Sequence, residues 1–167
     1  MFNKNFSLKK FYKYLYNAIV IITMALFILS SCNKVENKEL ILYNIQGKEI
    51  KRFPIKKDGH FYVKFLHSVN MSPVIDYYNF NDKNEIFVYK TIYYDFGAGV
   101  ETELENNETI TYGDGGSMII SNIDKKISPL TYYLSSIYDH KLSIDDNEEI
   151  SLWDVCGQNI IVEFKIK

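Results

Sequence analysis

Two histidines and two aspartates are the residues of this sequence best suited to chemistry: His67, Asp76, Asp95 and His140. Imidazole and carboxylate groups bind divalent metals and act as general acids and bases. The four residues are scattered, and no His-x-His or Cys-x-x-Cys pair accompanies them. Their spacing therefore leaves a metal site open without favouring it.

His67 follows the alternating segment Phe61-Tyr62-Val63-Lys64-Phe65. A strand through this segment places His67 on the same face as its apolar residues, where an imidazole needs a hydrogen-bond partner. The candidate partners are Ser68 and Asp76, with Asp95 and His140 across a sheet. The pattern favours a structural histidine at the bend before Pro73, and a ligand contact, a metal ligand or a general base are the alternatives.

Asp95 opens a turn that contains Gly97 and Gly99. The two glycines permit a tight bend, but a dinucleotide-binding loop needs a third glycine and a following helix, and acidic residues follow here instead. Ser68, Ser72 and Ser117 lie in no Gly-x-Ser-x-Gly motif, and Cys156 has no basic neighbours, so we expect no enzyme and treat Cys156 as a small buried hydrophobic residue. Tyrosines such as Tyr77 suit a pocket for a sugar or a small organic acid, although tyrosines more often simply populate strands.

Strands must position these residues. Tyr, Phe, Ile and Val runs are broken at Gly, Asn and Asp, and turns such as Gln46-Gly47, Asn81–Asn84 and Asp114–Gly116 join them. We predict an all-β domain, an antiparallel β-sandwich with a partly closed β-barrel as the alternative, and no helix of useful length after residue 31. The predicted strands cover residues 40–46, 49–55, 60–69, 74–80, 85–95, 108–113, 117–123, 130–137, 140–144 and 159–166.

The N-terminus is typical of a bacterial lipoprotein signal peptide. Four lysines precede an apolar run from Ala18 to Leu29, which is short for a membrane span, and Ser30-Ser31 lead to Cys32. We predict a signal peptide over residues 1–31, an acylated Cys32 with a tether over 32–39, and a single domain over 40–167. Cys32 then attaches the chain to membrane lipid on the extracytoplasmic side, in the periplasm or at the outer surface.

Removing residues 1–31 takes away four lysines and no acids, which leaves 15 basic and 21 acidic side chains and a formal charge of −6. Nucleic acid is therefore not an expected partner. With Cys32 acylated, Cys156 has no intrachain partner, so no disulfide framework is expected. The sequence indicates no cofactor.

Two blocks, Leu66-His67-Ser68-Val69-Asn70-Met71-Ser72-Pro73-Val74-Ile75-Asp76-Tyr77-Tyr78 and Tyr94-Asp95-Phe96-Gly97-Ala98-Gly99-Val100, resemble the bacterial family called domain of unknown function 1850. The likeness extends over most of residues 40–166. It implies a small exported or membrane-anchored protein, often encoded beside the membrane subunit of TAXI-type TRAP transporters, and it brings no catalytic residues. The sequence departs from the family pattern with Asp76 where Glu is frequent, and with Val100-Glu101 after the glycine turn.

We therefore expect a membrane-anchored, non-catalytic lipoprotein that serves as an accessory or adaptor component of a TRAP-type solute transport system and contacts its membrane subunit. The alternative is an extracytoplasmic module that binds a small organic solute or a metal around His67, Asp76, Tyr77 and Asp95. The candidate binding residues are His67, Ser68, Asp76, Tyr77, Asp95, Gly97, Gly99 and His140.

Overall fold

The computed structural model describes residues 4–30, 38–69, 71–95, 104–105 and 107–167. The chain divides into two units, Met1–Val35 and Glu36–Lys167. The first unit contains helix α1 (Lys4–Ser30). Among the described residues, no helix combines the length and the apolar character that crossing a membrane requires. Cys32, most of the predicted tether, Gly97 and Gly99 lie outside the described residues.

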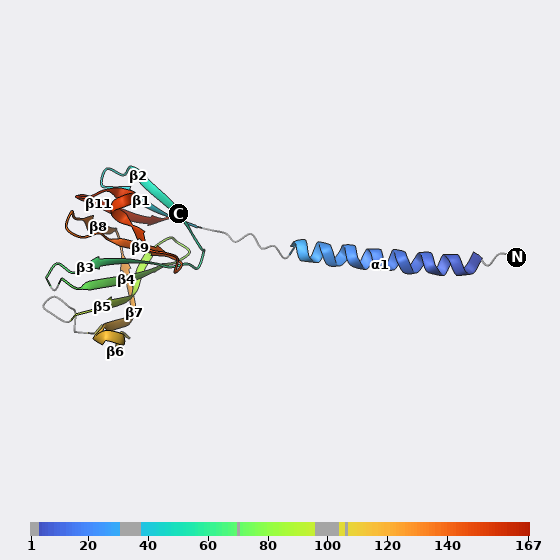
Figure 1. Cartoon of the computed structure of the whole chain (residues 1–167), viewed down its shortest axis with the longest axis horizontal. Helices are drawn as coiled ribbons and strands as arrows, with labels where there is room; N and C mark the ends of the chain where they lie inside the picture. Colours follow the sequence, from blue (N-terminus) through green and yellow to red (C-terminus); the bar gives the residue numbers. More distant parts are fainter. Residues whose placement is uncertain (1–3, 31–37, 70, 96–103, 106) are drawn as a thin grey trace. The chain divides into compact units, whose positions relative to one another are not determined.

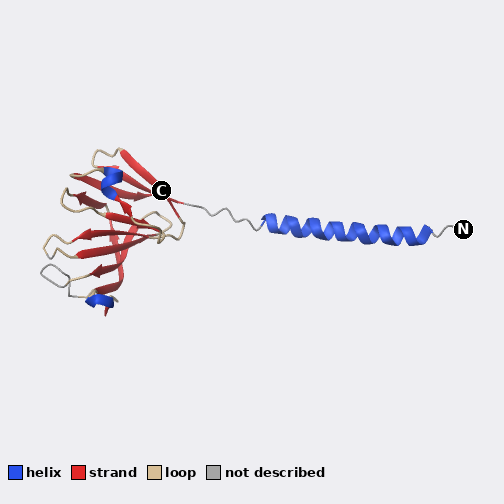
Figure 2. Cartoon of the chain, viewed as in Figure 1, coloured by secondary structure: helices blue, strands red, loops and turns tan. Residues whose placement is uncertain are grey.

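The second unit consists of two antiparallel sheets (Figures 1 and 2). The small sheet has the order β2 (Glu49–Ile55), β1 (Lys38–Asn44), β11 (Ile160–Ile166) and β8 (Leu130–Leu134). The large sheet has the order β10 (Ile150–Ser151), β9 (Lys141–Ile144), β3 (Phe61–Leu66), β4 (Pro73–Phe80), β5 (Ile86–Tyr93), β7 (Met118–Ile127) and β6 (Thr109–Tyr112). The predicted all-β sandwich is confirmed, and among the described residues the two sheets do not join into a barrel.

One core lies between the sheets. Strand β11 contributes one face to it, because Val162, Phe164 and Ile166 are buried and Ile161 and Lys165 are exposed. The ring of Phe164 stacks parallel to that of Phe61 from the large sheet, with 6.0 Å between the ring centroids. Burial of each such side chain contributes about 1.5–3 kcal/mol, so facing strands of the two sheets stabilise each other.

The hairpin turns follow the chemistry that the sequence predicts. Gly47, Asn84, Gly115 and Gly116 all have positive φ angles, which glycine and asparagine adopt with little strain. In the first turn, the Oδ1 atom of Asn44 accepts hydrogen bonds from the backbone N–H groups of residues 46 and 48. These turns set the register of the strands on either side.

Several predictions of elements and their boundaries are wrong: β7 continues to Ile127 instead of ending at residue 123, the short strand β10 was not predicted, and three other errors have an identifiable cause. Strand β3 ends at Leu66, because the backbone N–H of His67 donates to the carbonyl of Ser72 and closes a tight turn. Strand β8 ends at Leu134, and the carbonyl of Ser135 accepts a hydrogen bond from the Nε1–H group of Trp153. The third error is a missed short helix, α2 (Leu152–Cys156).

Two side chains that precede helix α2 in the sequence, Ser151 and Asp139, stabilise its first turn. The hydroxyl of Ser151 accepts from the backbone N–H of Asp154, which caps the helix. The carboxylate of Asp139 accepts from the backbone N–H of Trp153 and from the Ser151 hydroxyl. A five-residue helix has no stable period of its own, so these tertiary contacts, and not a helical pattern, create it.

Candidate functional site

The Asp76 carboxylate lies at the centre of a network of hydroxyl groups. Its Oδ1 atom accepts a hydrogen bond from the Thr91 hydroxyl at 2.8 Å. Its Oδ2 atom accepts from the Tyr132 hydroxyl at 3.0 Å and from the Tyr78 hydroxyl at 3.4 Å. The two tyrosine oxygens also lie within hydrogen-bonding distance of each other, at 2.6 Å; since each hydroxyl has one proton, the tyrosine that donates to the other does not donate to Asp76 at the same time. We call Asp76, Tyr78, Thr91 and Tyr132 the Asp76 network.

Strand register explains how the network assembles. Asp76 of β4 pairs with Thr91 of β5 and with Val63 of β3, and residues that pair directly across antiparallel strands lie on the same face. Tyr78 follows Asp76 by two residues and therefore shares that inner face. Tyr132 comes from β8 of the opposite sheet, so the network joins the two layers of the sandwich.

Burial sets the protonation behaviour of these groups. Loss of solvation raises the pKa of Asp76 above its usual value, and the hydrogen bonds from Thr91, Tyr132 and Tyr78 act in the opposite direction. Burial and the neighbouring Asp76 carboxylate raise the pKa of both Tyr78 and Tyr132. The two tyrosines therefore keep their protons at neutral pH and serve as hydrogen-bond donors.

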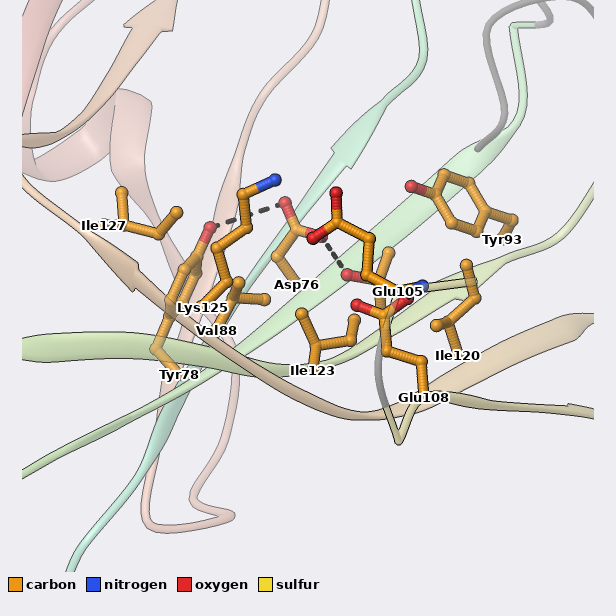
Figure 3. A pocket seen from close by; sticks show the side chains of 11 residues that line it. Asp76, Tyr78, Val88, Tyr93, Glu105, Glu108, Ile120, Ile123, Lys125 and Ile127 are labelled. Carbon is orange, nitrogen blue, oxygen red and sulfur yellow. Dashed lines mark hydrogen bonds between the residues drawn. The ribbon is translucent and has the colours of Figure 1, made fainter. Parts of the chain in front are cut away.

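The Asp76 network lies beside a pocket of about 230 Å³ (Figure 3). Its polar side comes from β4 and β5 and consists of Asp76, Tyr78, Thr91 and Tyr93. Its apolar wall comes from Val88, Ile120, Ile123 and Ile127 of β5 and β7. Glu105, Glu108 and Lys125 complete the lining with three charged side chains, and Figure 3 shows Glu105 and Lys125 extending toward Asp76.

Hydrogen bonding fixes part of the acidic wall. The Oε2 atom of Glu108 accepts from the backbone N–H of Glu105 at 2.8 Å, and the backbone N–H of Glu108 donates to the carbonyl of Glu105. This turn holds both glutamates next to the pocket just before β6. The pocket thus combines three carboxyl groups, one ammonium group and an aliphatic wall.

His140 contacts the Asp76 network through the ring of Tyr132. It is buried, with 8% of its surface exposed, and burial lowers its pKa below the ordinary value. Its ring stacks on Phe65 and meets the edge of Tyr132, with 5.7 Å between centroids in each case. Its Nδ1 atom is buried and has no hydrogen-bond partner within the described residues. His140 therefore packs against the ring whose hydroxyl binds Asp76, and it does not line the pocket.

The structure separates several residues that the sequence groups together. His67 lies in the β3–β4 turn, where its Nδ1 atom accepts a hydrogen bond from the backbone N–H of Val69 at 3.4 Å. It is half-exposed and so is not the core residue of the favoured prediction, although it does form the bend before Pro73. Ser68 is exposed in the same turn, and Asp95 is exposed just after β5. None of these three residues lines the Asp76 pocket.

Tyr77 lies on the opposite face of the large sheet from Asp76. Its ring is 5.1 Å from the ring of Tyr62 and 6.1 Å from that of Tyr89, and the Lys90 ammonium sits 3.7 Å above it. Successive side chains of a strand point to opposite faces, so Tyr77 and Asp76 cannot share one cleft. The predicted meeting of His67, Asp76, Tyr77 and Asp95 in a cleft is therefore wrong.

Sequence reasoning missed most partners of Asp76. Tyr78 follows from the two-residue period of a strand, since it lies two positions after Asp76. Thr91, Tyr132 and Lys125 approach only through the pairing and stacking of sheets, which the sequence does not fix. Among the described residues, no group of three His, Cys, Asp or Glu side chains is arranged to hold a metal ion.

Comparisons with known proteins identify the family. Searches of curated proteins and of solved structures gave no match. A family model described as "Domain of unknown function (DUF1850)" matches residues 61–152, which run from β3 through β10 and include Asp76, Thr91, Tyr132 and His140. This match covers more than half of the 167 residues. The chain therefore belongs to the DUF1850 family, as its two sequence blocks predict.

Proposed function

We propose that this protein is a lipid-anchored, non-catalytic module that binds a small organic solute in the Asp76 pocket. The Asp76 network carries this proposal. Each oxygen of Asp76 accepts at least one hydroxyl hydrogen bond, so the carboxyl group is held in one orientation next to an open pocket. A fixed polar group beside an aliphatic wall is the usual design of a small-ligand site.

The lining indicates the chemical class of the solute. Glu105, Glu108 and Asp76 outnumber Lys125, so the pocket favours a ligand with an ammonium group over an organic acid. The wall of Val88, Ile120, Ile123 and Ile127 favours a short apolar body. A volume of about 230 Å³ lies below the roughly 300–1,000 Å³ of sites for drug-sized ligands. We therefore propose a small alkylamine or an apolar amino acid as the ligand. The carboxylate of the amino acid would face Lys125.

The proposed address follows from Cys32. Acylation of Cys32 after removal of residues 1–31 would hold the domain at an extracytoplasmic membrane surface. Replacing Cys32 with Ser tests this step. We expect the variant to accumulate as a precursor or to leave the membrane fraction, whereas an unchanged mass and membrane fraction would contradict the lipid anchor.

We propose further that the uptake system served by this protein is of the TRAP type, with the transporter membrane subunit as its partner. Family membership motivates this part of the proposal, and a solute pocket on an anchored domain suits a component that passes solute to a transporter. The accessory role is separable from binding, because solute affinity is measured without the transporter.

A thermal-shift screen of the full chain in detergent tests the pocket. The panel contains n-alkylamines, apolar and polar amino acids, succinate, and divalent metal chlorides. A ligand at a hundred times its dissociation constant adds about 2.7 kcal/mol to the free energy of unfolding. We expect stabilisation by amines or apolar amino acids in the wild type and in Asp82→Asn, a control in the exposed β4–β5 turn, and none in Asp76→Asn or Glu105→Gln. No stabilisation by any amine or amino acid would contradict the proposal.

A further inference from the structure

The two ends of the sandwich differ in chemical character. The strand registers bring the ends of β1, β3, β5 and β8 to one end of the sandwich. The loops at that end cover residues 45–48, 67–72, 94–95, 113–117, 135–140 and 152–159. We call it the apolar end, and its loops project to the left in Figure 1. It carries exposed large hydrophobic side chains at Ile45, Val69, Met71, Tyr94, Ile137 and Tyr138.

The other end carries polar loops. Its connections include Lys56–His60, Asn81–Asn84, Ser128–Pro129 and Asp145–Glu149, and Lys38 and Lys167 also lie there. These loops are built on carboxylate, amide and ammonium groups, such as the bonds from the backbone N–H groups of Lys56 and His60 to Asp145. We call this the polar end. Because β1 begins at Lys38, the chain enters the domain at the polar end.

The exposure at the apolar end is large. Ile137 exposes 78% of its surface and Ile45 exposes 65%, and both lie in short connections between strands. A shallow pocket of about 250 Å³ next to Ile45 is lined by Tyr133, Ile160 and Ile161. Single exposed apolar residues are common on soluble proteins, but their concentration at one end of a domain marks an interaction surface.

The loops of this end carry more acidic than basic side chains. Among the described residues of its loops, Asp95, Asp114, Asp139 and Asp154 outnumber Lys48. Lys141, at the start of β9, pairs with Asp139 at 2.6 Å and compensates one of them. With that pair set aside, the exposed Asp114 and Asp154 still outnumber Lys48, so a basic partner is attracted, while a second copy of the same surface or an anionic bilayer is repelled.

From these observations we propose that the apolar end docks an extracytoplasmic protein whose contact surface has an apolar centre and a basic rim. This inference uses no residue of the Asp76 pocket and adds a second function to the proposed one. It rests on the proposed lipid anchor in one respect. Five residues lie between Cys32 and Lys38, so the six Cα–Cα steps that join them reach at most about 22 Å. The anchor therefore holds the polar end to the membrane and leaves the apolar end to face a protein that stands away from the bilayer.

Site-specific photocrosslinking of the full chain in its native host tests the inference. A photoreactive phenylalanine analogue replaces Val69 or Ile137 at the apolar end, and Lys57 or Asp82 at the polar end as matched exposed controls. We expect both apolar-end positions to give an adduct with the same heterologous protein, at about ten times the yield of the controls. Equal yields at the two ends, no adduct, or an adduct of two copies of this chain would overturn the proposal.

Charge reversal separates specific docking from adventitious contact. The double variant Asp114→Lys, Asp154→Lys is expected to lower the adduct yield from position 137 about tenfold, because the basic rim then meets like charges. An unchanged yield would overturn the charge argument and with it the choice of partner. The same variant is expected to keep its thermal shift with amines, so loss of docking is distinguishable from failure of the pocket proposal.

Binding to lipid vesicles tests whether the apolar end binds a membrane instead of a protein. The Cys32→Ser chain is centrifuged with vesicles of phosphatidylethanolamine and phosphatidylglycerol, alone and with Ile137→Asp. We expect no difference in the sedimented fraction between the two chains. Sedimentation that Ile137→Asp abolishes would identify lipid as the ligand of the apolar end and overturn the protein partner.

Discussion

Replacing Tyr132 with Phe tests the Asp76 network with a single atom. The change removes the hydroxyl that donates to Asp76 at 3.0 Å and bonds to Tyr78 at 2.6 Å. The ring remains, and with it the contacts to Phe65 and Phe164 at 5.6 and 5.8 Å between centroids. The stability change therefore reports hydrogen bonding and not a cavity.

The magnitude follows from the charge of the acceptor. A hydrogen bond to a charged group contributes about 1.5–3 kcal/mol, and the 3.4 Å bond from Tyr78 remains as partial compensation. We therefore expect Tyr132→Phe to lower the free energy of unfolding by about 2 kcal/mol at pH 8. For a domain of this size, that corresponds to a fall of about 8 °C in Tm.

The cost should also depend on pH with a definite sign. The Tyr132 hydrogen bond lowers the pKa of Asp76 in the folded state, so its loss raises that pKa further above the ordinary 3.8. This part of the loss in the free energy of unfolding is present in full above the folded-state pKa of Asp76 in the variant. It disappears below pH 3.8, where Asp76 is protonated in the folded and the unfolded chain. Tyr132→Phe should therefore destabilise the protein less at pH 3.5 than at pH 8.

Urea denaturation at the two pH values, followed by circular dichroism, measures both effects. Tyr133→Phe is the matched control, because the Tyr133 hydroxyl bonds to Asn159 at an exposed site and its loss should cost at most about 0.5 kcal/mol. Equal costs for the two variants at pH 8, or the same cost for Tyr132→Phe at both pH values, would refute the proposed role of the network.

Three further predictions concern titratable groups. Since burial raises the pKa of Asp76, the folded state binds protons more tightly than the unfolded chain. The free energy of unfolding therefore falls as the pH rises from 3.8 through the raised pKa. Urea titrations should show this fall in Asp82→Asn and not in Asp76→Asn. Asp139→Ala should cost about 2 kcal/mol at pH 7, because it removes the acceptor for Trp153, Ser151 and Lys141, and equal stability of variant and wild type in urea would contradict that role. Burial raises the pKa of Cys156 to about 11, so its labelling by iodoacetamide should accelerate about tenfold per pH unit from 7 to 10, and a rate that levels off near pH 9 would contradict the raised pKa.

The sequence predicts most of the fold because the fold depends on local rules. Alternation in β11 and the glycine and asparagine turns act over two to four residues, and each predicted strand overlaps an observed one. The boundary errors occur where tertiary contacts decide. Strand β8 ends at Leu134, whereas alternation alone would continue it, and α2 exists because Asp139 and Ser151 bind its first turn.

The candidate site was harder to predict. The sequence predicts Asp76 as a candidate, but Tyr77 cannot share its cleft, because neighbouring residues of a strand face opposite ways. Thr91 is fifteen residues from Asp76, and Tyr132 is fifty-six residues away in the other sheet. Contacts of this kind depend on strand order and on how the sheets stack, for which a single sequence contains no local signal.

The central claim, that the Asp76 pocket binds a small solute, is tested most directly by NMR of methyl-labelled protein. Ile120, Ile123, Ile127 and Val88 line the pocket and serve as probes, while Ile45 and Ile137 at the apolar end serve as references. Titration with the best amine or amino acid from the thermal screen should shift the pocket methyl signals in the wild type and leave those of Asp76→Asn and the reference signals in place. Shifts that are absent from the pocket, or that persist unchanged in Asp76→Asn, would contradict the account.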